Sequence, residues 1–575
     1  MDPHLGIPDP GKADGAPRRA YRRAYLSGRG RGFVHHGVRY RHRWGLYLRL
    51  NQNRYGKQRS LRVAGKDLLL VYDIGTTGLK CVVFSDQGQE LLSASATYQT
   101  YYPGSGWAEQ ESQDFWIAAQ RATAELQAQG TLHTDRIAAI GLSGHMNGCL
   151  AVSAAGEPLY RELIHADSRS VEERKDIQRR IGLENYYTLT GNRADEHLSL
   201  PKILWIQKNL QEVYRRTAFF INSKDYLRYR LTGRLGQTDF SDASLVCAMD
   251  IKQQRWSDPL LRELGLDTAK FPEIHKSSEI CGPLSQEASR ALDLPEGLPV
   301  VFGGGDAACA TRGAGVRDLS SAYAYIGSSA WISTLAPGPV GDPKQRTQNF
   351  FDLDPRKCNV CGTVQNAGIA VDWAHGLVAE TLDYGPMDAE VAAVPPGSRG
   401  VLFAPYLMGE RTPHWDANAR GSFVGLSLHH TRSDLLRSVY EGVAFALKDV
   451  LNVYTDLGIQ PEHLTLLGGG SKSQVWRSIF SDVFALPIAP HSAPTNATSL
   501  GAAMAAAVGT GLYADLDSAT RMAHVLPTET PSPGGIETYQ QLYPIYRKLY
   551  QALRPITNDL ANLRNTEEYN ESRGN

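Results

Sequence analysis

The first strongly apolar positions of this chain lie at residues 68–72. They lead into the string 73–78 (Asp-Ile-Gly-Thr-Thr-Gly), and a second apolar run follows at 81–84. Two β-type runs around a glycine-containing turn predict a hairpin. Farther along, 111–129 has the apolar spacing of a helix, and 137–142 is typical of a buried strand. Strand and helix patterns keep alternating downstream, which predicts a layered α/β fold.

A second hairpin with the same order of residue types is predicted 252 residues downstream of the first. An apolar run at 322–326 is followed by the turn Gly327-Ser328-Ser329 and by a further apolar run at 331–333. The strings 74–77 (Ile-Gly-Thr-Thr) and 326–329 (Ile-Gly-Ser-Ser) differ only by Ser in place of Thr. Two halves that open with the same hydroxyl-bearing turn indicate a duplicated architecture. A chance likeness between two common turns is the alternative.

The second half also contains a long amphipathic helix. Thr431 and Asp434 form a capping-box pattern, and apolar residues then recur every three or four positions. Downstream, 464–467 is a predicted strand that ends in the glycines 468–470. A predicted helix of small residues follows at 501–509. Its composition would let another element pack closely against its backbone, although an ordinary core helix explains it equally well.

Residues 1–66 differ from the rest in charge. They hold 16 Lys and Arg against 3 Asp and Glu, which leaves 44 against 57 in the remainder. Low hydrophobicity with high local charge predicts a disordered basic N-terminal extension. The favoured interpretation is a solvated tail. The alternatives are an arm that contacts nucleic-acid phosphates and bases, as at 39–44, or residues upstream of the true start. We do not expect a nucleic-acid partner.

Length and cysteine usage limit the class of protein. At 575 residues the chain is too long for one core. No apolar stretch approaches the roughly 20 residues that cross a bilayer, so no membrane partner is expected. Seven cysteines are few and odd in number, which argues against a disulfide framework. A cytoplasmic location fits best.

Four glycine-rich turns follow apolar strands, at 75–78, 303–305, 327–329 and 468–470. Such turns expose backbone N–H groups that can hold phosphate oxygens. No P-loop string is present. Residues 303–308 satisfy the dinucleotide pattern Gly-x-Gly-x-x-Ala, but an aspartate within it would face the pyrophosphate, so a nicotinamide enzyme is disfavoured.

Two aspartates beside these turns are candidates for phosphoryl-transfer chemistry. Asp306 lies at a predicted helix N-terminus, where the helix dipole favours an ionised carboxylate. A helix cap would explain it equally well. Asp73 precedes the first turn, where it could hold the waters of Mg²⁺, with a local turn as the alternative. Phosphoryl transfer needs positioning, Mg²⁺ and a carboxylate that accepts the hydroxyl proton.

Taken in order, these strings resemble the FGGY family of carbohydrate kinases from about residue 67 to residue 550. The other matching strings are 106–110 (Gly-Trp-Ala-Glu-Gln), 224–227 (Lys-Asp-Tyr-Leu), 238–244 (Thr-Asp-Phe-Ser-Asp-Ala-Ser), 405–413 (Pro-Tyr-Leu-Met-Gly-Glu-Arg-Thr-Pro) and 468–473 (Gly-Gly-Gly-Ser-Lys-Ser). No single string is decisive, and the resemblance rests on the ordered series.

The resemblance implies an α/β fold with two ribonuclease H-like domains of the actin/hexokinase type around a central cleft. The expected organisation is the disordered basic extension 1–66, an N-terminal domain 67–317 on the sugar and phosphate side, a C-terminal domain 318–560 on the nucleotide side, and a flexible tail 561–575.

The resemblance also implies roles for individual residues, with ATP and Mg²⁺ as cofactors. Asp306 is expected to be the general base that activates a sugar hydroxyl, and Asp73 to serve Mg²⁺ through water. The sugar is expected to contact Met146, Asn147, Asp167, Arg169 and Asp306. The expected nucleotide contacts are Gly75, Thr76, Thr77, Gly327, Ser328, Ser329, Gly468, Gly469, Gly470 and Ser473.

The acceptor region departs from the family members that phosphorylate D-xylulose. Their sugar loop has the sequence Gln-Met-His-Gly, whereas residues 145–148 are His-Met-Asn-Gly here. Their Trp-x-Asp-x-Arg string appears as 165–169 with His in place of Trp. Conversion of D-xylulose to D-xylulose 5-phosphate remains the leading expectation. The alternative acceptors are gluconate, another ketose or a polyol. The alternative class is a catalytically silent sensor that binds ATP and sugar. A homodimer is one option for assembly.

Overall fold

The computed structural model describes residues 65–378 and 383–574, which belong to one compact unit. The basic extension predicted at 1–66 lies outside the described residues except for its last two positions. Within the described part of the chain, no helix is both long enough and apolar enough to cross a membrane.

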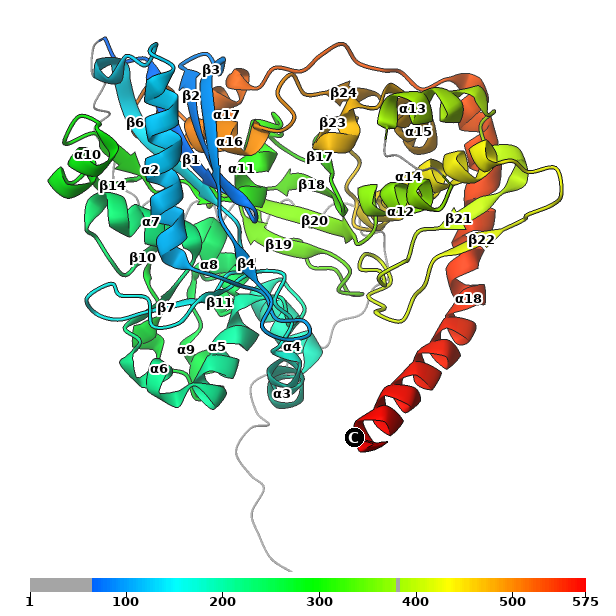
Figure 1. Cartoon of the computed structure of the whole chain (residues 1–575), viewed down its shortest axis with the longest axis horizontal. Helices are drawn as coiled ribbons and strands as arrows, with labels where there is room; N and C mark the ends of the chain where they lie inside the picture. Colours follow the sequence, from blue (N-terminus) through cyan, green and yellow to red (C-terminus); the bar gives the residue numbers. More distant parts are fainter. Residues whose placement is uncertain (1–64, 379–382, 575) are drawn as a thin grey trace, which may run out of the picture. The chain divides into compact units, whose positions relative to one another are not determined.

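Two mixed β-sheets dominate the described structure (Figure 1). The first contains β1 (Leu68–Ile74), β2 (Gly78–Ser85), β3 (Glu90–Thr97), β6 (Ile137–Gly144), β14 (Ile280–Pro283), β15 (Pro299–Val301) and β16 (Gly304–Gly305). The second contains β17 (Ser321–Ile326), β18 (Ala330–Ala336), β19 (Gln348–Phe351), β20 (Cys358–Val364), β23 (His463–Leu467) and β24 (Ile488–Pro490).

Short strands and helices surround these sheets. The short strands are β4 (Thr100–Tyr101), β5 (Glu109–Gln110), β7 (Leu150–Val152), β8 (Glu162–Leu163), β9 (Phe219–Ile221), β10 (Gln237–Asp239), β11 (Met249–Asp250), β12 (Arg255–Trp256), β13 (Glu273–His275), β21 (Leu402–Ala404) and β22 (Ser422–Val424). The helices up to the second sheet are α2 (Ser112–Ala128), α3 (Val171–Ile181), α4 (Leu183–Thr190), α5 (Ser199–Asn209), α6 (Gln211–Arg216), α7 (Ser223–Thr232), α8 (Phe240–Val246), α9 (Asp258–Glu263), α10 (Gln286–Leu292) and α11 (Asp306–Gly313). The later helices are α12 (Gly368–Val378), α13 (Tyr384–Ala393), α14 (Arg432–Asp456), α15 (Gln474–Phe484), α16 (Ala497–Gly509), α17 (Leu516–Ala519) and α18 (Pro533–Gly574).

The two sheets repeat one topology. The first has the order β14-β15-β6-β1-β2-β3, with β16 also paired to β6, and the second has the order β24-β23-β17-β18-β20-β19. In each, the opening strand is antiparallel to the next strand and parallel to a later one: β1 to β2 and β6, and β17 to β18 and β23. Both predicted hairpins and the duplicated architecture are therefore confirmed.

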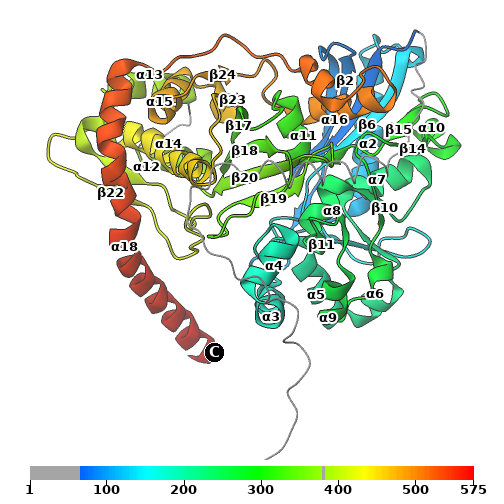
Figure 2. The ribbon, with the colours of Figure 1, turned by 180° about the vertical axis from the view of Figure 1, so that it is seen from behind.

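The central strand of the first sheet is buried on both faces. Because side chains alternate along a strand, Leu68, Leu70 and Tyr72 join the apolar core that contains α2. Leu69 and Val71 join a separate core that contains the small residues of α16. In Figures 1 and 2, α16 (orange) lies beside the blue strands β1 and β2, although more than 400 residues separate them along the chain.

The small residues of α16 permit an unusually close helix contact with α11. A Cβ atom at Gly501 would lie 1.9 Å from the backbone oxygen of Cys309 in α11. The prediction that some element packs closely against this helix is confirmed. The predicted boundary between residues 317 and 318 assigns α16 to the second domain, whereas its contacts are with the first sheet; the boundary itself stays a prediction.

The predicted capping box at Thr431 and Asp434 is present and begins α14. Together with α12 and α15, this helix covers the second sheet and forms its core. The last helix, α18 (red in Figure 1), packs against α15 and β21 and continues to Gly574. Helical geometry thus extends into the segment predicted as a tail, whose flexibility stays a prediction.

Candidate active site

Three segments of the first sheet end at one edge. In the parallel pairing of β1 with β6, Asp73 is opposite Ser143 and Ile74 is opposite Gly144. The short strand β16 pairs with the same end of β6, with Gly305 opposite Gly144. Three features therefore begin next to one another at this edge: the turn after β1, the predicted sugar loop 145–148 and the helix that starts at Asp306.

The approach of the glycine segment to the sugar loop requires the absence of a side chain. A Cβ atom at Gly305 would lie 2.4 Å from both Cγ and Sδ of Met146. Met146 is only 4% exposed, so it has little room to move aside. The predicted base and the predicted sugar contact are consequently neighbours across a backbone that only glycine permits.

Asp306 is the first residue of α11, and the N-cap position belongs to Gly305. The alternative interpretation of Asp306 as the cap is therefore wrong. Its Oδ1 accepts a hydrogen bond of 2.7 Å from the backbone N–H of Ala307. Burial, together with the charge of Asp73, raises the pKa of Asp306 to about 7, against the opposing effect of backbone N–H groups.

Asp73 is nearly buried at the end of β1 and accepts a hydrogen bond of 3.0 Å from Ser499 Oγ of α16. Burial raises the pKa of Asp73, and the charge of Lys80 and hydrogen bonds to serine hydroxyls counteract this. The sequence did not indicate Ser499, because its position beside Asp73 depends on the return of α16 to the first sheet.

A buried polar network supports the backbone just before Asp306. The N–H of Gly305 donates to Ser241 Oγ at 2.9 Å, and that hydroxyl donates to Asp239 Oδ2 at 2.5 Å. Asp239 also forms an ion pair of 3.0 Å with Lys224. All three side chains are fully buried. The strings 224–227 and 238–244, which contributed only to the family resemblance, therefore position the candidate base.

Asp167 and Arg169 form a buried ion pair with an N–O distance of 2.7 Å. Arg169 also pairs with Glu109 at 2.8 Å, and its guanidinium lies 3.7 Å from the ring centre of Trp107. These contacts leave Arg169 Nη1 buried without a hydrogen-bond partner among the described residues. The predicted contact of Arg169 with the sugar stays a prediction.

The sugar loop presents further buried polar atoms. Asn147 has a φ of 64°, and its Oδ1 has no partner within the described ranges. Both ring nitrogens of His145 are likewise buried without a hydrogen-bond partner among those residues. Burial lowers the pKa of His145 to about 3 and that of His165 to about 4, and their ring centres lie 6.0 Å apart. Two neutral imidazoles therefore stand where the sequence departs from members that phosphorylate D-xylulose.

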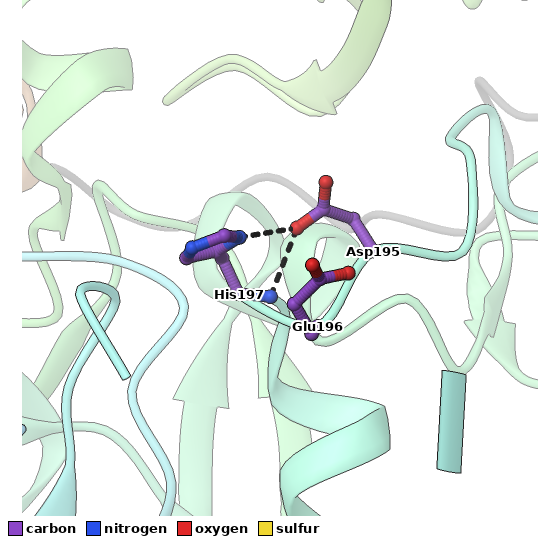
Figure 3. A group of neighbouring side chains, drawn as sticks. All are labelled: Asp195, Glu196 and His197. Atoms are coloured by element: carbon purple, nitrogen blue, oxygen red, sulfur yellow. Dashed lines mark hydrogen bonds and ion pairs between the residues drawn. The ribbon is translucent and has the colours of Figure 1, made fainter. Parts of the chain in front are cut away.

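Asp195, Glu196 and His197 form a polar group whose metal-binding atoms lie within 4.8 Å of one another (Figure 3). Asp195 Oδ1 accepts from the backbone N–H of His197 at 2.9 Å and lies 2.8 Å from its ring Nδ1. Glu196 pairs with Arg174 at 2.9 Å. Burial would raise the pKa of Asp195, but contacts with His197 and the charge of Arg411 lower it overall. Asp195 Oδ1, His197 Nδ1 and one carboxylate oxygen of Glu196 are thus engaged by protein partners.

Five of the expected nucleotide residues line one pocket of about 520 Å³ beside the second sheet. The parallel pairing of Tyr325 with Leu467 places the turns after β17 and β23 side by side. Of the predicted residues, those that line the pocket are Gly327, Ser328, Gly469, Gly470 and Ser473. Those outside its lining are Gly75, Thr76, Thr77, Ser329 and Gly468.

The same pocket has a wall that the sequence did not indicate. Its aromatic members are Tyr384, Tyr440 and Trp476. Tyr384 Oη donates to Asp372 Oδ1 at 2.5 Å, and Tyr440 Oη donates to Asp388 Oδ1 at 3.0 Å. An apolar, aromatic wall beside glycine turns suits a planar base followed by phosphates.

Strand β17, which leads into the first turn of this pocket, lies close to the carboxylates of the first sheet. Tyr325, two residues before Gly327, has a pKa raised by burial and by the charges of Asp306 and Asp73. Its neighbour on β17, Tyr323, donates a hydrogen bond of 3.4 Å from Oη to the carbonyl of Ala307. Strand β17 therefore contacts the start of α11, and the position of Asp306 near the turns at 75 and 327 stays a prediction.

The chain thus combines a duplicated α/β fold, a pocket lined by glycine turns and aromatic rings, and two aspartates at one edge of the first sheet. The family profile described as the FGGY family of carbohydrate kinases, N-terminal domain, matches residues 68–313, and that for the C-terminal domain matches residues 322–510. This chain belongs to the FGGY family of carbohydrate kinases, enzymes that use ATP.

Similar proteins include both xylulose and gluconate kinases. The chain is 30% identical to the xylulose kinase of Staphylococcus xylosus over 483 residues, covering 83% of this chain and 98% of that protein. Ligand-bound xylulose kinase from Lactobacillus acidophilus superposes with a TM-score of 0.81 at 28% identity, covering 86% of this chain and 99% of that one. Gluconate kinase from the same organism gives 0.80 at 28% identity, with 84% and 98% covered.

Proposed function

We propose that this kinase transfers the γ-phosphoryl group of ATP to a hydroxyl of D-xylulose, forming D-xylulose 5-phosphate, with Asp306 as the general base. The observation that carries this proposal is the position of Asp306, at the sheet edge shared by the first phosphate turn and the sugar loop. Its pKa of about 7 also suits a group that must take up a proton near neutral pH.

In the proposed reaction, Asp306 accepts the proton of the acceptor hydroxyl. The hydroxyl oxygen forms a bond to the γ-phosphorus, the bond between that phosphorus and the β,γ-bridging oxygen breaks, and ADP leaves. Met146, Asn147, Asp167 and Arg169 would hold the sugar. The turns 75–77, 327–329 and 468–470, with Ser473, would hold the nucleotide.

The residues at this sheet edge fit a divalent cation. The charge of Asp73 raises the pKa of Asp306, so two carboxyl groups compete for ionisation in a buried setting. Asp73 would hold Mg²⁺ through water, and the cation when bound neutralises charge on the triphosphate. Ser499 would keep the Asp73 carboxylate in place through their hydrogen bond.

The acceptor preference is supported by relatives that are named xylulose kinases. Gluconate is the second candidate, because a gluconate kinase has a similar TM-score and the sugar loop differs at residues 145 and 147 from the D-xylulose pattern. A cytoplasmic location, a homodimer and the domain limits 67–317 and 318–560 remain further proposals.

A screen of ADP release tests this assignment. We expect D-xylulose to give the highest kcat/KM in a panel of ketoses, aldonates and polyols, as the relatives named xylulose kinases suggest. A higher value with gluconate would favour the second candidate. The absence of acceptor-dependent ADP release across the panel, with ATP still bound, would instead indicate the silent sensor.

The pH dependence of kcat/KM offers a separate check. A base with a pKa of about 7 must be ionised to act, so kcat/KM should rise with pH to a plateau above about pH 7. Below that value, activity should fall about tenfold for each pH unit as Asp306 becomes protonated. A profile that is flat between pH 5 and pH 8 would contradict the role of Asp306.

A further inference from the structure

Lys202 is a fully buried lysine on α5. Its ammonium group donates three hydrogen bonds, to the backbone carbonyl oxygens of Asn147 at 2.8 Å, Ile164 at 2.7 Å and His197 at 2.8 Å. Among the ion pairs of the described residues, none involves Lys202. All three N–H groups are thus committed to the backbone.

The three carbonyls belong to three separate segments around the candidate acceptor site. Asn147 is in the sugar loop after β6, and Ile164 lies just before the segment that holds Asp167 and Arg169. His197 belongs to the polar group drawn in Figure 3. A single ammonium group therefore connects the backbone of three segments that are separate in the sequence, at Asn147, Ile164 and His197.

Two of the segments joined by Lys202 hold several of the buried polar atoms that lack partners among the described residues. Asn147 Oδ1, Arg169 Nη1 and the ring nitrogens of His145 are buried and unpartnered in the part of the chain that the structure describes. Buried polar atoms are costly unless they are hydrogen-bonded, so a ligand or water is needed to complete them. Their arrangement depends on the backbone that Lys202 holds.

We propose that Lys202 is a positioning residue that sets the affinity for the acceptor, by holding the sugar loop and the two neighbouring segments in a single arrangement. This inference rests on the proposed function for the identity of the site. Lys202 does not contact the acceptor, because its three donors are already used. Its influence reaches the acceptor through Asn147 and through the segment of Asp167 and Arg169.

The charges around Lys202 add a pH dependence to this arrangement. Burial lowers the pKa of Lys202 to about 8, and the carboxylates of Asp167, Glu162 and Asp195 and the thiol of Cys149 oppose this shift. The rings of His145 and His165 also face it, and burial, with a smaller effect of the Lys202 charge, lowers the pKa of both. A neutral amine has two N–H groups for three carbonyls, so one segment loses its bond above about pH 8.

The first experiment uses the wild-type protein. The acceptor KM should rise between about pH 8 and pH 9.5, while the ATP KM stays within about twofold. Glu162, whose burial raises its pKa to about 8, titrates in the same range. The variant Lys202→Met separates the two, because its acceptor KM should be high at every pH. A rise above pH 8 that persists in Lys202→Met would assign it to Glu162 and overturn the proposal.

The second experiment compares Lys202→Met with Lys208→Met. Lys208 lies on the same helix but is largely exposed, and its ion pair within the described ranges is with Glu173, at 3.2 Å. Loss of hydrogen bonds from a charged donor should raise the acceptor KM about 10- to 100-fold in Lys202→Met. The kcat and the ATP KM should change by less than about threefold, and Lys208→Met should match the wild type. An unchanged acceptor KM, or an equal loss in kcat, would overturn the proposal.

Hydrogen exchange provides a readout that needs no acceptor. In Lys202→Met, amides of 145–148, 164–169 and 195–198 should exchange faster together, while those of 468–473 keep the wild-type rate. Wild-type exchange at pH 9.5 compared with pH 7, corrected for intrinsic rates, should show the same pattern even if the variant does not fold. Unchanged protection in these segments would overturn the proposal, whereas failure of the ADP-release screen alone would affect only the proposed function.

Discussion

Replacing Asp306 with Asn is expected to lower kcat by a factor of about 10²–10⁴, the usual contribution of a general base. The amide cannot accept the proton of the acceptor hydroxyl, yet it occupies the same volume and retains an oxygen that can accept the N–H of Ala307. The KM values for acceptor and ATP should therefore change much less than kcat. Steady-state kinetics of ADP release with D-xylulose as acceptor measures both.

The matched control for this change is Asp258→Asn. Asp258 is likewise the first residue of a helix, α9, but it is exposed. At the exposed Asp258 the loss of a helix-terminal charge should cost little stability. At Asp306 burial and the charge of Asp73 already disfavour the ionised form, so loss of the charge there should not destabilise the fold. Only Asp306→Asn should lose activity. Near-full kcat in that variant would remove Asp306 from the chemistry.

The second large effect is expected from Gly501→Ala. The added Cβ would meet the backbone oxygen of Cys309 at 1.9 Å, and a backbone atom cannot move aside as a side chain can. Overpacking of this kind typically costs 1–3 kcal/mol, and a backbone clash should lie near the upper end, at about 3 kcal/mol. The variant should melt at a lower temperature. It should also lose activity, because α11, which begins with Asp306, must shift away from α16.

Gly376→Ala is the control for Gly501→Ala. Gly376 also lies in a helix, α12, but a Cβ atom there would meet nothing within 4 Å. Because Ala is the better helix former, this variant should be unchanged or more stable by up to about 1 kcal/mol. If both variants melted alike, the α11–α16 contact would not be as close as the structure places it.

Much of the fold follows from local pattern. Both hairpins, the strand at 137–142, the helix at 111–129 and the long capped helix after Thr431 are present where periodicity and turn residues predict them. These features depend on neighbours within a few residues, so the order of residue types is sufficient to indicate them. The helix that begins at Asp306 is likewise present where the local sequence predicts it.

The residues that support the site could not be predicted from local pattern. Nothing local in the sequence links Ser241 to Gly305, or Ser499 to Asp73, because each pair is far apart along the chain. Lys202 does have one local signal, because it is a lone lysine within the apolar string Leu-Pro-Lys-Ile-Leu-Trp at 200–205. A cation at such a position must find partners when it is buried, although the pattern does not say which ones.

Local residue order is enough to locate the starts of strands, turns and capped helices, and to single out the glycine turns and carboxylates that are candidates for phosphoryl transfer, because these features depend on contacts within a few residues. Long-range packing brings α16 back to the first sheet, places Ser499 beside Asp73 and lets Lys202 join three segments around the candidate acceptor site. Such contacts form when distant parts of the chain bury apolar surface together, and their partners depend on the path of the whole chain.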